Sequence, residues 1–105
     1  MKVVYIAGPY RAKTEWQLEQ NIRHAERISL DWWRQGWAVI CPHKNTARMG
    51  GACDDDIWLS GDLELLRRCD AICMLNGWDT SIGAQAEYDE ARKQGIRIYF
   101  EDGSQ

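Results

Sequence analysis

The chain has 105 residues, a formal net charge of −3, 45% hydrophobic residues and 28% charged residues. This length suits one domain, which we expect to span residues 1–105. An acidic chain offers no broad cationic surface, so nucleic-acid polymers are excluded as expected partners. No apolar run approaches the roughly 20 residues of a membrane span, and residues 1–10 do not form an export signal. We therefore expect no membrane partner and a cytoplasmic location.

Four short apolar segments predict β-strands, at residues 2–7, 37–41, 71–75 and 96–100. They stop at turn signals such as Gly8-Pro9, Pro42 and Asn76-Gly77. Short, continuously apolar strands that alternate with helices are typical of a parallel sheet covered on both faces. The predicted fold class is therefore α/β.

Three helices are predicted between these strands. The first has Thr14 as N-cap, with Gln17 three residues later in the capping-box pattern, and it ends at Gly36. The second spans residues 57–69, and the third begins near Ile82 and ends at Gly95. Residues 42–55 are predicted to be one long irregular segment, which in a compact domain is typical of a functional lid or a mobile loop.

Two carboxylates occupy unusual places on these helices. Asp62 falls in the middle of the apolar arc of the second helix, where an unpaired carboxylate costs several kcal/mol. Glu87 shares a face of the third helix with small residues, among them Gly83 and Ala84, which leave space around it. It lies within about two turns of the helix N-terminus, where the macrodipole favours the ionised form. The alternatives are a backbone hydrogen bond for Asp62 and an ordinary surface position for Glu87.

Three loops are expected to meet beyond the carboxyl ends of the parallel strands, where such folds bind ligands. The first is residues 8–11, which offers a close backbone approach at Gly8, the ring of Tyr10 and the cation of Arg11. The second is Pro42-His43. The third, residues 76–81, ends with the hydroxyl of Ser81 beside helix-start amides, and together the loops could hold a phosphate. Taken singly, Arg11 could be solvated, Ser81 could be an N-cap, and His43 could make only a local hydrogen bond.

Cofactor and metal sites are not predicted. The chain has no glycine-rich dinucleotide motif and no P-loop. Cys41 and His43, followed by an acidic run at residues 54–56, do not match the ligand spacing of a known metal site. The four cysteines, Cys41, Cys53, Cys69 and Cys73, form no CxxC pair and are expected to be reduced.

The motifs YIAGPYR, GDLELLRRCD and SIGAQAE, in this order, resemble the nucleoside 2-deoxyribosyltransferase superfamily. The likeness is greatest to its small members, the 2'-deoxynucleoside 5'-phosphate N-hydrolases, and covers nearly the whole chain. The resemblance implies a three-layer, flavodoxin-like sandwich with a four- to five-stranded parallel sheet. It also implies that Glu87 is the nucleophile, that Asp62 lies near the sugar and the departing base, and that Tyr5 positions Glu87.

The resemblance further implies binding residues for the 5'-phosphate, namely Gly8, Arg11, Ser81 and, from the other protomer of a dimer, Ser104. Pro9 and Tyr10 stand where those hydrolases carry a small hydroxyl residue and an aliphatic one. We further predict that Gly83 borders the site and that His43 and Trp78 meet the base. The six tryptophans predict a subunit contact, and the expected assembly is a homodimer or higher homo-oligomer.

The predicted function is cleavage of the base–sugar bond of a 2'-deoxynucleoside 5'-monophosphate, with a small-molecule nucleoside or nucleotide as the partner and no cofactor. Three alternatives stay open. They are base exchange between nucleosides, a nucleotide-binding module without turnover, and cleavage of the nicotinamide bond of a dinucleotide.

Overall fold

The computed structural model describes residues 1–104 and contains a four-stranded parallel sheet. Its strands are β1 (Val3–Ala7), β2 (Ala38–Ile40), β3 (Ala71–Met74) and β4 (Arg97–Phe100), in the spatial order β2-β1-β3-β4. The register pairs Tyr5 with Ile40 on one side and with Ile72 on the other. The predicted α/β class and the four-stranded form of the sheet are confirmed.

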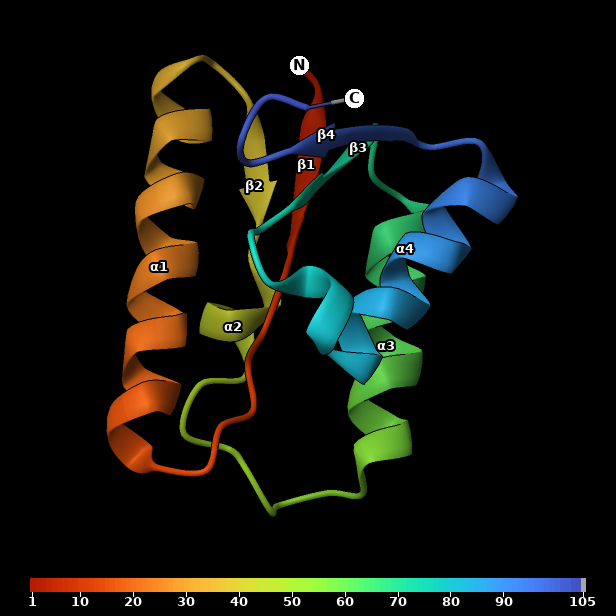
Figure 1. The fold of residues 1–105 in the computed structure, drawn as a ribbon. Helices are drawn as coiled ribbons and strands as arrows, with labels where there is room; N and C mark the ends of the chain where they lie inside the picture. Colours follow the sequence, from red (N-terminus) through yellow and green to blue (C-terminus); the bar gives the residue numbers. More distant parts are fainter. Residues whose placement is uncertain (105) are drawn as a thin grey trace.

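Helices cover both faces of the sheet, so that the molecule has three layers (Figure 1). The long helix α1 (Glu15–Arg34) lies on one face, and α3 (Asp55–Arg67) and α4 (Ile82–Gln94) lie side by side on the other. A short helix α2 (Pro42–Asn45) follows β2, and a 3-10 turn η1 (Trp78–Thr80) precedes α4. None of the helices within residues 1–104 is both long enough and apolar enough to cross a membrane.

The central strand β1 divides the core into two clusters, because successive side chains point to opposite faces of a sheet. Val4 and Ile6 pack toward α1, together with Ala25 of that helix. Tyr5 and Ala7 pack toward α3 and α4. Tyr5 is therefore a polar side chain in the middle of a buried strand, and it is 0% exposed.

Local signals set the ends of the helices as predicted. The Thr14 hydroxyl accepts a hydrogen bond from the Gln17 backbone N–H at 3.0 Å, and Gly36 follows α1 with φ of 90°. Gly95 ends α4 in the left-handed conformation, with φ of 71°. A residue with a Cβ atom is strained at such a φ, which explains glycine at both helix ends.

Two predictions about the middle of the chain need correction. Residues 42–55 are not irregular throughout, because Pro42 provides the fixed φ that suits the first turn of α2. The next helix covers Asp55–Arg67 rather than residues 57–69. It starts earlier because Asp55 and Asp56 are favourable in a first helical turn. It ends earlier because Arg68 caps it before β3 begins.

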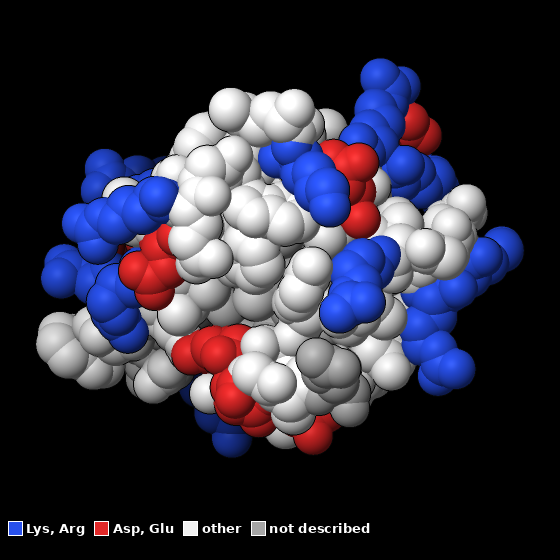
Figure 2. Space-filling view, turned by 90° about the horizontal axis from the view of Figure 1, so that it is seen from above, with Lys and Arg blue, Asp and Glu red and all other residues white. Residues whose placement is uncertain are grey.

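Charged side chains do not gather into one basic patch on the face shown in Figure 2. Lys and Arg are scattered over this view, interspersed with acidic groups and separated by uncharged surface. This distribution agrees with the net charge of −3 and offers no continuous cationic track on that face.

Candidate active site

A cleft of about 630 Å³ lies where the loops after β1 and β2 meet the start of α4. Each loop that the sequence predicted at the carboxyl edge of the sheet contributes to it. The first supplies Gly8, Pro9, Tyr10 and Arg11, the second Pro42 and His43, and the third Thr80 and Ser81. Asp62, Gly83 and Glu87 complete the predicted part of the wall. This cleft is the candidate active site.

Glu87 forms part of the wall of the cleft, in the second turn of α4. The residue is only 8% exposed, and its neighbours on the helix include Gly83 and the buried Ala84 and Ala91. One carboxylate oxygen accepts a hydrogen bond from the phenol of Tyr5, which lies on β1, 82 residues away in the chain. Strand and helix together therefore fix the direction of this side chain.

Burial, rather than the helix dipole, controls the protonation of Glu87. The pKa of Glu87 is raised to about 8, mainly by desolvation, while the hydrogen bond from Tyr5 lowers it and the charge of Asp62 raises it. The modest effect expected from the position of Glu87 on α4 is therefore outweighed by burial. The macrodipole effect is limited to the first turn and is smaller than the cost of burying a charge.

Asp62 projects from α3 into the same cleft and is half-buried. Desolvation raises its pKa to about 6. The helix face that the sequence predicted for Asp62 therefore faces the cleft. With pKa values near 6 and 8, Asp62 and Glu87 together hold one proton around neutral pH.

Tyr5 lies behind Glu87 and does not line the cleft itself. Its pKa is raised far above the ordinary value, first by burial and then by the charges of Glu87 and Asp62. The phenol therefore keeps its proton at any physiological pH and acts as a fixed hydrogen-bond donor to Glu87. This contact agrees with the positioning role that the family resemblance implies for Tyr5.

The first loop approaches Leu75, the residue after β3, so closely that only glycine fits at position 8. A Cβ atom on Gly8 would lie 2.6 Å from the Cβ atom of Leu75. Arg11, farther along this loop, borders the cleft but forms an ion pair with Asp55 at the start of α3. Both side chains are largely exposed, so this ion pair lies at the solvent-facing part of the cleft wall.

Ser81 caps α4, as its alternative role predicted. Its hydroxyl oxygen accepts a hydrogen bond from the Ala84 backbone N–H at 3.2 Å. The hydroxyl proton stays available as a donor toward the cleft, since the capping bond uses only the oxygen. N-capping and ligand binding are therefore compatible for this residue.

His43 is buried under the first loop. Its Nε2 atom lies 2.8 Å from the carbonyl oxygen of Pro9 and donates to it, while its ring meets that of Tyr10 edge-on at 5.5 Å. Burial lowers the pKa of His43, so the ring is neutral near pH 7. The structure thus realises the local hydrogen bond that was the alternative role, and it also places His43 in the cleft wall.

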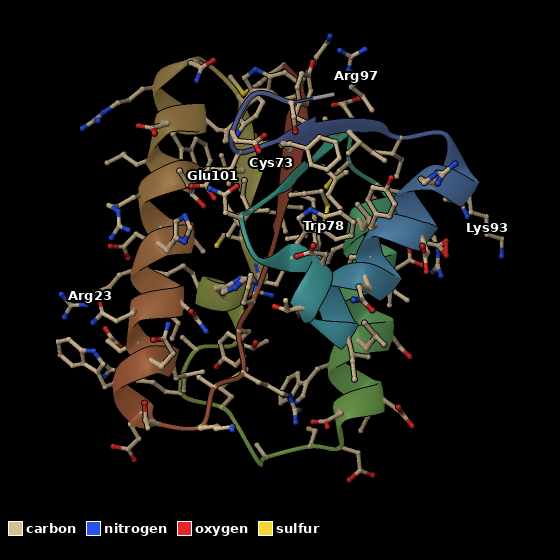
Figure 3. All side chains as sticks on the ribbon, in the orientation of Figure 1. Arg23, Cys73, Trp78, Lys93, Arg97 and Glu101 are labelled. Atoms are coloured by element: carbon tan, nitrogen blue, oxygen red, sulfur yellow. The ribbon has the colours of Figure 1, made fainter. Side chains whose placement is uncertain are left out.

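Trp78 and Ser104 do not line the cleft. Trp78 stacks on Tyr88 with 4.5 Å between ring centroids and lies near Phe100, on the α4 side of the sheet (Figure 3). The prediction that Trp78 meets the base is corrected. After the turn at Gly77, with φ of 88°, the ring of Trp78 packs against α4 and β4 and therefore does not reach the cleft wall. Ser104 lies after β4, where its backbone N–H donates to Asp102.

A family model described as a domain of unknown function, DUF4406, matches residues 2–100 of the chain. The chain belongs to this DUF4406 family. No curated protein matches the sequence at a significant level.

Solved structures with a similar fold include enzymes that act on nucleosides or nucleotides by name. A 2-deoxyribosyltransferase from the psychrotolerant bacterium Bacillus psychrosaccharolyticus has 17% identity and a TM-score of 0.66, over 93% of this chain and 70% of that one. A 2-desoxiribosyltransferase from Leishmania mexicana has 18% identity and a TM-score of 0.67, over 95% and 63%. The Clostridium botulinum CMP N-glycosidase BcmB has 19% identity and a TM-score of 0.61, over 94% and 67%.

These matches show that the chain has the fold of these two deoxyribosyltransferases and of the N-glycosidase, as the resemblance implied. This DUF4406 chain spans between 63% and 70% of the length of the three structures. At identities below 20%, the likeness concerns the arrangement of the sheet and helices, and the chemistry of the cleft has to be argued from its own residues.

Several cleft residues were not predicted. α3 contributes Asp55, Asp56, Trp58 and Leu59, and the loop before it contributes Gly50 and Gly51. The sequence could have indicated Trp58 and Leu59, because they fall in the same apolar arc of the helix as Asp62. Residues three and four positions apart share a helix face, so they line the same cleft. No three His, Cys, Asp or Glu side chains within residues 1–104 are grouped to hold a metal ion.

Proposed function

We propose that the protein cleaves the N-glycosidic bond of a 2'-deoxynucleoside 5'-monophosphate by a retaining mechanism in which Glu87 is the nucleophile. One observation carries this proposal: a buried carboxylate at the cleft wall, held by the Tyr5 phenol, with a second carboxylate in the same cleft. Retaining glycosidases use two carboxyl groups in one cavity, of which one attacks the anomeric carbon and the other transfers a proton.

Asp62 and Glu87 hold one proton near neutral pH, and the higher pKa of Glu87 places that proton mainly on Glu87. The reactive form is the less populated arrangement, in which Glu87 attacks the anomeric carbon as a carboxylate while Asp62 carries the proton and gives it to the departing base. The carbon–nitrogen bond breaks, and the electron pair leaves with the nitrogen. A sugar ester of Glu87 forms, and positive charge that develops on the sugar is stabilised by the nearby carboxylates.

Water completes the reaction. A water molecule attacks the anomeric carbon of the ester and releases Glu87 as a carboxylate, while Asp62 accepts the proton from the water. The pair returns to its starting state with one proton. The donor hydrogen bond from Tyr5 stabilises Glu87 as an anion at the beginning and at the end of the cycle.

The monophosphate is favoured by the groups at the outer end of the cleft. Ser81 and Gly83 begin α4, whose first backbone amides suit an anion, and Arg11 adds a cation. An unphosphorylated nucleoside is the second candidate, because Asp55 already pairs with Arg11 and Asp56 adds another negative charge. A phosphate has to displace Asp55 to reach Arg11, whereas a nucleoside does not.

We further propose a homodimer or higher homo-oligomer in which Ser104 contributes to a neighbouring site. Two tryptophans of α1 support a subunit contact, since Trp16 is 74% exposed and Trp33 is 53% exposed. Analytical ultracentrifugation at micromolar concentration tests this assembly, and a monomer would contradict it.

The experiment for the activity is a panel of four 2'-deoxynucleoside 5'-monophosphates and the matching nucleosides, with release of free base followed by chromatography. The phosphorylated set should yield base. Glu87→Gln should lower the rate about 10³-fold or more. The matched control is Asp89→Asn, an exposed acid on the same helix, which should behave like the wild type.

The outcomes separate the alternatives. Incorporation of an added acceptor base indicates base exchange instead of hydrolysis. Saturable binding with an unchanged ligand, and no loss of affinity in Glu87→Gln, indicates a binding module. Release of nicotinamide from a dinucleotide indicates cleavage of the nicotinamide bond. If no substrate yields base and Glu87→Gln binds as the wild type does, the proposed activity is wrong.

A further inference from the structure

Glu101, a residue outside the cleft wall, lies at the junction of three elements. It directly follows β4, and its backbone N–H donates to the Met74 carbonyl of β3 at 2.9 Å. Figure 3 shows its side chain between α1 and the end of β3. The side chain is only 16% exposed. A carboxylate in such a place requires partners for its oxygens.

Both oxygens of Glu101 have partners from distant parts of the chain. Oε1 accepts a hydrogen bond from the backbone N–H of Asn76 at 2.8 Å. Oε2 lies 2.8 Å from Nε2 of His24 on α1. The carboxylate therefore ties α1 to the first residue after Leu75, the end of the buried segment that includes β3.

Asn76 begins the loop that carries one wall of the cleft. This loop passes through Gly77 and η1 to Thr80 and Ser81, both of which line the cleft. It also touches the first cleft loop, since a Cβ atom on Gly77 would lie 3.2 Å from Cγ of Pro9. The two cleft loops are therefore neighbours at Gly77 and Pro9.

The same face of α1 holds the first cleft loop as well. Asn21 lies one helical turn before His24 and donates through Nδ2 to the Tyr10 carbonyl oxygen at 3.1 Å. Each of the two loops that border the outer cleft is thus fastened to α1, one through Asn21 and the other through His24 and Glu101.

We propose that Glu101 is a positioning residue for ligand binding, because its carboxylate fixes residues 76–81 against α1 and so places Thr80 and Ser81 at the cleft. This inference rests on the proposed function for the identity of the ligand, but not for the contact itself. Glu87 lies in the second turn of α4, beyond the loop, so Glu101 acts on binding rather than on the attacking group.

Glu101→Ala removes the acceptor of Asn76, and Glu101→Gln restores it, because the amide oxygen of Gln can accept the same hydrogen bond. We expect Glu101→Ala to raise KM for the monophosphates about five- to tenfold, since the net contribution of an ordinary intramolecular hydrogen bond corresponds to roughly that factor. We expect kcat to stay within about twofold, as the attacking group is not moved. Glu101→Gln should return KM to within about twofold of the wild type.

The matched control is Glu64→Ala, which also removes a Glu from an ion pair but does so on the outer side of α3, with Arg68. His24→Ala removes only the outer support of Glu101 and should have a smaller effect on KM than Glu101→Ala. If Glu101→Ala fails to fold, Glu101→Gln and His24→Ala still test the contact.

Amide hydrogen exchange of residues 76–81 gives a readout that does not depend on turnover. Glu101→Ala should accelerate exchange there about tenfold, while Glu64→Ala should not. Unchanged exchange, or accelerated exchange with KM as in the wild type, overturns the positioning role. If no variant and no wild-type protein cleaves any substrate, the proposed function fails, and the exchange result alone decides whether Glu101 holds the loop.

Discussion

The two faces of the sheet bury very different groups, although both are built on the same strand. Toward α1, β1 presents Val4 and Ile6, and the layer is completed by Trp32, Trp37 and Tyr99 in edge-on contacts of 4.9 to 6.1 Å between ring centroids. Toward α3 and α4, the same strand presents Tyr5 to the buried Glu87.

This difference separates stability from chemistry. The aromatic layer on the α1 side removes apolar area from water and makes favourable ring contacts, both of which stabilise the fold. The acid layer on the other side holds carboxyl groups whose charged forms are disfavoured by burial. The aromatic layer therefore contributes to stability, while the acid layer holds groups of raised pKa.

The largest effect is expected on the aromatic face. Trp32→Ala should lower the free energy of unfolding by about 3 kcal/mol, because it removes a large side chain that contacts Trp37 and Tyr99. Trp16→Ala, on the same helix but 74% exposed, is the control and should change it by less than about 0.5 kcal/mol. Urea denaturation measures both, and equal effects would contradict the distinction.

On the acid face, replacement should stabilise the protein. The pKa of Glu87 is raised by burial from 4.5 to about 8 in the folded chain. Between these values the unfolded chain loses a proton that the folded chain keeps, so stability falls as pH rises. Glu87→Gln removes this loss, so its gain in stability over the wild type should grow as pH rises from 4.5 to 8, with no gain below pH 4.5.

Thermal unfolding of Glu87→Gln and Asp89→Asn at pH 4 and pH 8 checks this expectation. A gain that does not grow with pH would show that Glu87 is ionised in the folded protein. In that case the acid face would not be under electrostatic strain, and the contrast between the two faces would be lost.

Activity should depend on pH through both acids. If the reaction needs one proton on the pair, kcat/KM should be bell-shaped, with limbs near the pKa values of about 6 and 8. Below the lower limb both groups are protonated and no nucleophile is present. Above the upper limb both are ionised and the base has no proton donor.

Each pH unit beyond a limb should lower kcat/KM about tenfold, which corresponds to about 1.4 kcal/mol. Asp62→Asn should remove the limb near pH 6. A profile that is flat from pH 5 to pH 9 would contradict a shared proton.

The smallest effect is expected at the outer cleft. Asp55→Asn frees Arg11, and we expect KM for the monophosphates to fall about threefold while KM for the nucleosides stays constant. Stability should hardly change, because both side chains are exposed. Glu64→Gln, in another exposed pair, is the control. An equal fall of KM for nucleosides and monophosphates would exclude a phosphate at Arg11.

Local patterns in the sequence determined where helices begin and end and on which helix faces the two acids lie. Thr14 and Gln17 start α1, Gly95 ends α4, and helical periodicity alone places Asp62 and Glu87 beside apolar or small neighbours. These features follow from φ/ψ preferences and from the 3.6-residue repeat, which act over a few residues and can therefore be read from the chain.

Only the tertiary structure decided which groups meet and how they titrate. Tyr5 reaches Glu87 across 82 residues because β1 lies beside β3, from which the chain continues into α4. Arg11 meets Asp55, Glu101 meets Asn76, and Trp78 turns away from the cleft, all through packing between elements that are distant in sequence. The pKa of Glu87 likewise depends on how much water the assembled layers exclude, a property that no short segment possesses.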